Sequence, residues 1–193
     1  MLASMNTALL VIDVQESFRQ RQADWQARTN PHVVEQVDRL VTAARAAGDL
    51  VVWVLHTEPG SGGVFDPANG FVRPIEPLAP IDGEPLVRKT SINAFTTTNL
   101  HQLLTANGIR EVVVCGIRTE QCCETTARVA SDLGYDVRFV TDATSTSGIE
   151  ANGPLAAVSG AEIVARTESV LAARGFATIV TTDEVVAAAG VPA

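Results

Sequence analysis

The feature that most constrains the fold is an alternation between short apolar runs and longer segments with helical periodicity. Runs that are apolar on both faces are typical of parallel strands covered by helices on each side. We expect strands over residues 8–14, 50–55, 85–89, 112–114, 135–141 and 176–181. We expect helices over residues 31–47, 95–107 and 120–133, and within 154–173. This order predicts a three-layer α/β/α sandwich around a six-stranded, mainly parallel sheet.

Length and charge exclude several classes of protein. A chain of 193 residues with 46% hydrophobic content can form one large core, so we expect a single domain over residues 1–193. The 22 acidic and 14 basic residues give a formal net charge of -8, which disfavours nucleic acid and anionic membranes as partners. No apolar run approaches the roughly 18 residues of a membrane span, and residues 1–7 lack the pattern of a secretory leader. We therefore expect a cytoplasmic protein.

The three cysteines do not form a recognisable framework. Two of them, Cys122 and Cys123, are adjacent, and no Cys-x-x-Cys or clustered histidine spacing indicates zinc. The chain also lacks a Gly-x-Gly-x-x-Gly sequence after its first strand and lacks a Walker sequence. We expect reduced thiols, no metal and no cofactor.

Cys122 is a candidate nucleophile. The apolar run over residues 112–114 is followed by Gly116 and then by Thr119, which suits the N-cap of a helix. Cys122 would then be the third helical residue, where free N–H groups and the helix dipole lower the pKa of a thiol. The same N–H groups can stabilise the oxyanion that forms when sulfur attacks a carbonyl. The alternative is a small buried cysteine that packs the helix against the sheet.

Polar residues also follow other predicted strands. Asp13 closes residues 8–14, Lys89 closes residues 85–89, and His56 follows residues 50–55. Because ligands bind outside the carboxyl ends of parallel strands, Asp13 and Lys89 are candidates for catalysis. The alternatives are a capping carboxylate, a surface lysine and a histidine with a purely structural hydrogen bond.

A long segment after His56 is expected to border the site. Residues 56–88 contain 11 glycines and prolines among 33 residues, which is typical of a lid or a binding loop. The polar loop 142–148 follows another strand and is placed to border the same crevice. The side chains expected to bind substrate are Phe18, His56, Phe65, Phe95 and Ile117, although an aromatic residue such as Phe65 could equally pin its loop to the body.

Three blocks of this sequence resemble the signature blocks of the isochorismatase-like cysteine hydrolases. They are Leu-Leu-Val-Ile-Asp-Val-Gln (9–15), Arg-Lys-Thr-Ser-Ile-Asn-Ala-Phe (88–95) and Gly-Ile-Arg-Thr-Glu-Gln-Cys-Cys-Glu-Thr-Thr-Ala (116–127), and the likeness extends from about residue 7 to residue 186. The resemblance implies a Rossmann-like fold with a catalytic triad of Asp13, Lys89 and Cys122. It also implies a cis peptide bond before Arg118, with the backbone N–H groups of Arg118 and Cys122 forming the oxyanion hole. Cys123, where the family commonly has valine, is then a packing residue.

The resemblance also distinguishes between the reactions that members of this family catalyse. Nicotinamidases of this family carry an Asp-x-His metal site after the second strand, and the sequence His56-Thr57-Glu58 departs from it. Isochorismate vinyl-ether hydrolases typically lack the cysteine. The resemblance therefore implies hydrolysis of the C–N bond in a small amide or ureide through a thioester, by a homo-oligomer. A vinyl-ether hydrolase, a catalytically silent binding module and a redox sensor using Cys122 and Cys123 remain alternatives.

Overall fold

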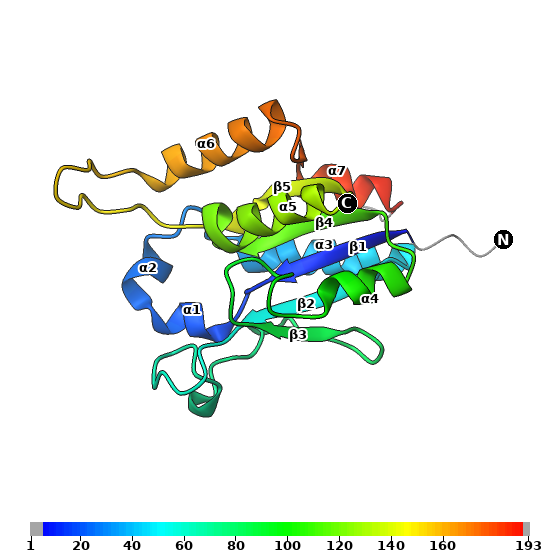
Figure 1. Ribbon diagram of the computed structural model, residues 1–193, viewed down its shortest axis with the longest axis horizontal. Helices are drawn as coiled ribbons and strands as arrows, with labels where there is room; N and C mark the ends of the chain where they lie inside the picture. The colour runs from blue at the N-terminus through cyan, green and yellow to red at the C-terminus, as the bar shows by residue number, and fades with distance from the viewer. Residues whose placement is uncertain (1–5, 191–193) are drawn as a thin grey trace.

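The computed structural model describes residues 6–190 and contains one parallel sheet covered on both faces by helices (Figure 1). The strands are β1 (Thr7–Ile12), β2 (Leu50–His56), β3 (Leu86–Lys89), β4 (Glu111–Ile117), β5 (Asp136–Ser145) and β6 (Thr178–Val180), in the spatial order β3-β2-β1-β4-β5-β6. All five neighbouring pairs are parallel. The predicted six-stranded α/β/α sandwich is confirmed. The expectation that residues 1–7 lack a secretory leader concerns mainly residues 1–5, which lie outside the described residues.

The helices fill two apolar layers that the sheet separates. The elements are α1 (Glu16–Gln20), α2 (Gln22–Gln26), α3 (Val33–Ala47), η1 (Pro67–Asn69), α4 (Leu100–Ala106), η2 (Thr119–Cys123), α5 (Glu124–Asp132), α6 (Gly160–Ala173) and α7 (Thr182–Ala188). Alternate residues of β1 enter different layers: Leu10 packs with residues of α4 and α5, whereas Leu9 packs with residues of α3. Burial on both sides explains why this strand is a continuous apolar run. No helix among residues 6–190 is long and apolar enough to cross a membrane.

The helix after β3 begins later than its sequence predicts, at Leu100 instead of residue 95. The side chain of Asn93 accepts hydrogen bonds from the backbone N–H groups of Phe95 and Thr96, at 2.8 and 2.9 Å. The hydroxyl of Thr98 then bonds to the carbonyl of Ala94 and to the N–H of Leu100. These side chains satisfy the backbone in a turn and so compete with the helix.

The expected loop 142–148 is partly strand, because β5 continues to Ser145. The pairing of β5 with β4 shifts register on the way: Val114 lies opposite Phe139, but Gly116 lies opposite Thr144. The side-chain amide of Asn30 donates to the carbonyl oxygens of Asp142 (2.7 Å) and Thr144 (3.2 Å). The Asn30 side chain thus gives β5 hydrogen-bond partners where its pairing with β4 is interrupted. Strand propensity alone does not predict such a contact from a distant residue.

Candidate active site

Asp13 is positioned by an unusual backbone turn at the carboxyl end of β1. It has φ 54°, the only positive φ of a non-glycine residue among residues 6–190, and its N–H donates to the carbonyl of Val54 at 2.8 Å. An aspartate adopts this left-handed conformation more readily than most residues. The carboxylate is fully buried, and neither oxygen has a hydrogen bond of ordinary geometry to another described residue.

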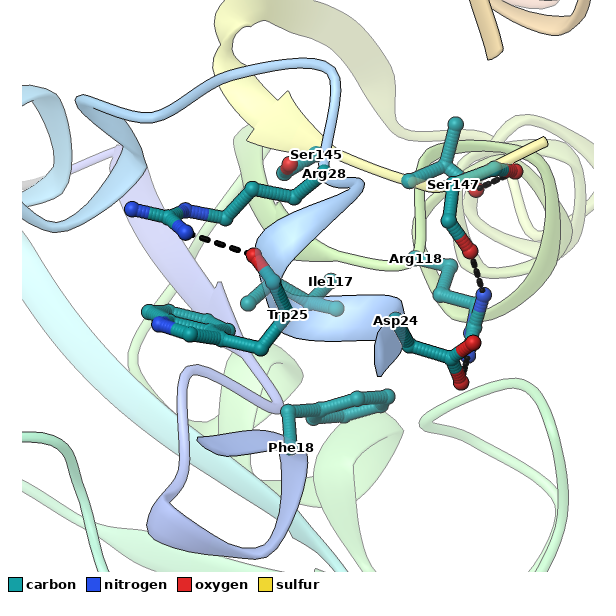
Figure 2. Close-up of a pocket in the computed structure, with 9 residues that line it drawn as sticks. Phe18, Asp24, Trp25, Arg28, Ile117, Arg118, Ser145 and Ser147 are labelled. Carbon is teal, nitrogen blue, oxygen red and sulfur yellow. Dashed lines mark hydrogen bonds and ion pairs between the residues drawn. The ribbon is translucent and has the colours of Figure 1, made fainter. Parts of the chain in front are cut away.

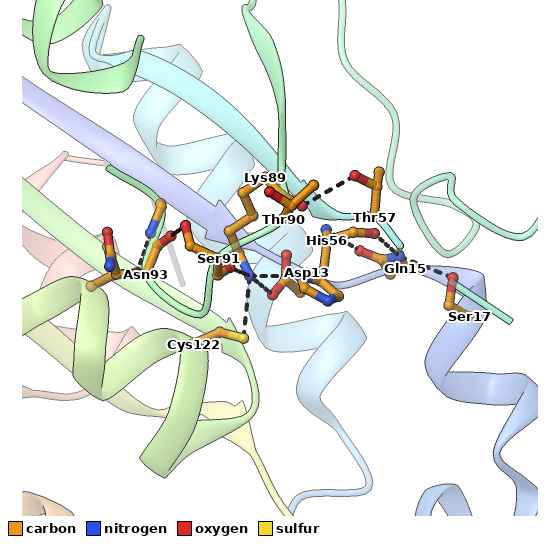
Figure 3. Close-up of polar contacts among 12 residues, drawn as sticks. Asp13, Gln15, Ser17, His56, Thr57, Lys89, Thr90, Ser91, Asn93 and Cys122 are labelled. Carbon is orange, nitrogen blue, oxygen red and sulfur yellow. Dashed lines mark hydrogen bonds and ion pairs between the residues drawn. The ribbon is translucent and has the colours of Figure 1, made fainter. Parts of the chain in front are cut away.

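Lys89 connects Asp13 to the candidate nucleophile (Figure 3). Its ammonium nitrogen lies 2.8 Å from Oδ2 of Asp13 and 3.3 Å from Sγ of Cys122. It also donates to the carbonyl of Ser91 at 3.2 Å and lies 3.4 Å from Nδ1 of His56. The side chain is fully buried. The structure therefore brings together an acid, an amine and a thiol that are far apart in the sequence.

Cys122 lies on a turn that differs from the expected helix start. The segment Thr119–Cys123 is a π-helical turn that continues into α5, and Cys122 is its fourth residue. Thr119 is not an N-cap; its hydroxyl donates to the hydroxyl of Thr144 across the neighbouring strand at 2.9 Å. The Ile117–Arg118 peptide bond that precedes this turn is cis, as the resemblance implies.

The electrostatics of the site correct the expectation of a thiolate. Burial raises the pKa of the Cys122 thiol to about 12, Asp13 adds to the increase, and Lys89 opposes it. Burial also raises the pKa of the Asp13 carboxyl, although the ammonium of Lys89 works in the other direction. For Lys89 burial disfavours the charge, yet Asp13 and Cys122 keep its pKa above the ordinary value. These shifts favour a neutral thiol beside the Asp13–Lys89 pair.

A pocket of about 120 Å³ opens beside the thiol. Its lining consists of Asp13, Phe18, Arg21, His56, Glu58, Phe65, Ile92, Arg118, Gln121 and Cys122. The rings of Phe18 and Phe65 meet edge to face, with centroids 5.1 Å apart, and Phe65 packs in the same way on His56 at 5.4 Å. One wall is therefore aromatic, while Arg21 and Glu58 bring opposite charges to the pocket.

Two of the five residues expected to bind substrate lie elsewhere. Phe95 stacks on Tyr135 with centroids 6.3 Å apart and belongs to the apolar layer with α4 and α5. Ile117 is buried and lines a smaller neighbouring pocket, of about 20 Å³, instead (Figure 2). Phe95 follows the turn at Asn93, whose side chain accepts a hydrogen bond from the N–H of Phe95. Phe18, His56 and Phe65 do line the pocket beside Cys122.

The side chain of Arg118 stands between the two pockets and contributes to both linings. Its guanidinium bonds to Asp24 at 2.6 Å and to the hydroxyl of Ser147 at 2.7 Å (Figure 2). Arg21 also pairs with Asp24, at 3.1 Å. This network joins α2 to the segment after β5 and forms one side of the pocket.

Several residues of the site were not assigned a role from the sequence. Gln15 is fully buried, and its side-chain amide bonds to both the N–H (2.8 Å) and the carbonyl (3.1 Å) of His56. Arg21, Ile92 and Gln121 line the pocket. Gln15, Ile92 and Gln121 belong to the three blocks of the resemblance, which was the available signal. Arg21 lies outside these blocks, on the turn between α1 and α2, whose direction a sequence pattern does not specify.

The site offers no metal cluster within residues 6–190: no three histidine, cysteine or acidic side chains are grouped so that they could hold an ion. Nε2 of His56 and Oε1 of Glu58, which flank the position where the sequence departs from the Asp-x-His pattern, lie 3.4 Å apart. His56 also contacts Lys89, and both residues line the pocket.

A buried cysteine, aspartate and lysine thus meet at the carboxyl edge of the parallel sheet of this α/β protein. Residues 7–158 match the isochorismatase domain model. The chain is 38% identical to streptothricin hydrolase from Streptomyces noursei over 147 residues, which are 75% of this chain and 51% of that protein. It is 34% identical to Nicotinamidase 3 from Arabidopsis thaliana over 154 residues, 72% of this chain and 73% of that protein.

A solved structure agrees with these sequence comparisons. The cysteine hydrolase from Pseudomonas syringae pv. phaseolicola superposes with a TM-score of 0.88 at 27% identity, covering 98% of this chain and 94% of its own. The chain belongs to the isochorismatase family and has the fold of its hydrolases.

Proposed function

We propose that this protein hydrolyses the C–N bond of a small amide or ureide through a thioester on Cys122. The observation that carries the proposal is the contact of Lys89 with both Asp13 (2.8 Å) and Cys122 (3.3 Å) at the wall of a small pocket. The names of two relatives, a streptothricin hydrolase and a nicotinamidase, support a hydrolytic role.

In the first half-reaction Asp13 acts as the general base. It accepts the proton of the Cys122 thiol as sulfur attacks the substrate carbonyl, and a C–S bond forms. A carboxylate with a raised pKa suits this role, because its basicity is closer to the operating pH. Asp13 then returns the proton to the leaving nitrogen as the C–N bond breaks, which leaves a thioester and a free amine or ammonia.

In the second half-reaction water cleaves the thioester. Asp13 accepts a proton from the attacking water and returns it to sulfur, so that the acid is released and the thiol is regenerated. Lys89 stabilises the negative charge on the sulfur after Asp13 has taken the proton, and on the Asp13 carboxylate after Asp13 has given the proton up. We assign the oxyanion to the backbone N–H groups of Arg118 and Cys122, and we expect the protein to act as a homo-oligomer on a small molecule.

Ammonia release from a panel of small amides and ureides tests this function, with Cys122→Ser as the variant and Cys123→Ala as its matched control. Cys123 is adjacent but fully buried and does not line the pocket. We expect Cys122→Ser to lose activity by about a thousandfold or more, whereas Cys123→Ala keeps it. Full activity in Cys122→Ser would disprove the covalent mechanism, and loss of turnover on adding a chelator would indicate a metal-dependent one.

A further inference from the structure

His56 holds a fixed place directly beside Lys89. It ends β2, and its register partner on β3 is Lys89. The two hydrogen bonds from Gln15 engage both backbone groups of His56, and the edge-to-face contact with Phe65 covers its ring. The side chain is only 14% exposed. Backbone and ring are thus both restrained, and the imidazole has little freedom to turn away from its neighbours.

The partners of the ring determine which nitrogen carries the proton. Nδ1 lies 3.4 Å from the ammonium of Lys89 (Figure 3). Nε2 lies 3.4 Å from Oε1 of Glu58. An ammonium can only donate and a carboxylate can only accept. Nδ1 is therefore the acceptor, and the proton on Nε2 faces Glu58.

The ammonium of Lys89 has three protons and four neighbours. These neighbours are Asp13, Cys122, the carbonyl of Ser91 and Nδ1 of His56. The direction of the ammonium depends on how its three protons are shared among these acceptors. The carbonyl of Ser91 and Nδ1 of His56 take no part in the reaction, so their contacts can hold the ammonium in place.

We propose that His56, oriented by Glu58, is a positioning residue that keeps the ammonium of Lys89 directed at Asp13 and Cys122. This inference rests on the proposed function to the extent that Lys89 stabilises negative charge on the sulfur of Cys122. It differs from the expectation that His56 binds substrate, and the two roles have different kinetic consequences. A positioning residue changes turnover, whereas a residue that binds substrate and transition state equally changes KM alone.

Three substitutions at His56 separate these roles. The side-chain oxygen of asparagine can replace Nδ1, glutamine reaches the place of Nε2, and alanine replaces neither. We expect His56→Ala and His56→Gln to lower kcat for amide hydrolysis about tenfold with KM within about twofold, and His56→Asn to recover most of the loss. His32→Ala, at an exposed histidine directly before α3 that does not line the pocket, is the matched control and should change neither constant.

The second readout is the rate at which iodoacetamide modifies Cys122, followed by peptide mass spectrometry at pH 8. Because Lys89 favours the thiolate, we expect His56→Ala to slow this reaction about tenfold and His56→Asn to restore it. This measurement needs no substrate, so it decides the role of His56 even if the wild type hydrolyses nothing in the panel. If alanine fails to fold, the comparison of Asn with Gln decides instead.

Two outcomes would overturn the proposal. A raised KM with unchanged kcat and unchanged alkylation would make His56 a substrate-binding residue. Equal alkylation rates in the Asn and Gln variants would show that the acceptor at Nδ1 has no bearing on Lys89.

The proposal is supported if His56→Asn restores both the turnover and the alkylation rate. Support for the part played by Glu58 would be a rate near wild type in Glu58→Gln and a reduced rate in Glu58→Ala.

Discussion

Gly116 on β4 lies so close to Ile12 on β1 that a Cβ atom at Gly116 would overlap the carbonyl oxygen of Ile12. Gly116 also has φ +131°, a conformation that other residues rarely adopt. This approach occurs just before Asp13 on one strand and just before the nucleophile turn on the other. The glycine therefore lets two of the three candidate catalytic side chains meet.

Replacing Gly116 by alanine should destabilise the protein strongly. We expect a loss of about 3 kcal/mol or more in the free energy of unfolding, because the new methyl group must displace backbone. Gly134→Ala is the control: it has φ +89° but open space around its Cβ, and about 1 kcal/mol is expected there. Urea unfolding of both variants measures the difference, and equal losses would show that the overlap with Ile12 is relieved at no cost.

Removing the buried amine should leave Asp13 as an uncompensated charge. We expect Lys89→Met to lower stability at pH 7 by about 3–5 kcal/mol, and we expect the double variant Asp13→Asn/Lys89→Met to recover most of it. Both proteins should be inactive. Urea unfolding at pH 7 provides the comparison, and a double variant no more stable than Lys89→Met would contradict the view that burial of an unpaired carboxylate is the cause.

The alkylation of Cys122 should depend steeply on pH. A thiol with a pKa of about 12 is almost fully protonated at neutral pH, and only the thiolate reacts. We therefore expect the rate with iodoacetamide to rise about tenfold for each pH unit between about pH 6 and 9. The same peptide in Cys122→Ala supplies the blank. A plateau near neutral pH would mean that the resting site already holds a thiolate.

Glu124, two residues after Cys122, should contribute stability that is lost in acid. It is 4% exposed and accepts hydrogen bonds from Arg128 (2.7 Å), Arg166 (2.6 Å) and Thr167 (2.8 Å), which join α5 to α6. Burial favours the neutral acid, but these bonds outweigh it and lower the pKa of Glu124. A depressed pKa stabilises the fold above the unfolded value of about 4.3 and ceases to do so as pH falls through the folded value.

Glu124→Gln should accordingly lower the free energy of unfolding by about 2–3 kcal/mol at pH 7, with the difference shrinking in acid. Thr167→Val, which removes one of the three partners, should cost about 1 kcal/mol. Chemical unfolding at pH 7 and below pH 4 measures both effects. A difference between Glu124→Gln and wild type that is independent of pH would rule out the ionised carboxylate as its source.

Sequence patterns predicted the sheet because burial on both faces leaves a strong signal in runs such as β1 and β4. The positions of Asp13 and Lys89 followed from strand order along the chain, since carboxyl ends of parallel strands share one edge. The start of α4 and the place of Phe95 did not follow, because the side chains of Asn93 and Thr98 bond to backbone groups of neighbouring residues. The pKa of Cys122 was expected to fall but rises, since burial is a property of the assembled protein.

The sheet divides the apolar interior into two bodies, and Cys122 belongs to the one beneath α4 and α5 while Leu40 of α3 belongs to the other. The layer of α3 also reaches the site directly, because it contains Phe18 and Phe65, whose rings line the pocket beside the sulfur. Substitutions in that layer that leave these two rings in place are therefore expected to change tolerance to heat more than speed of turnover.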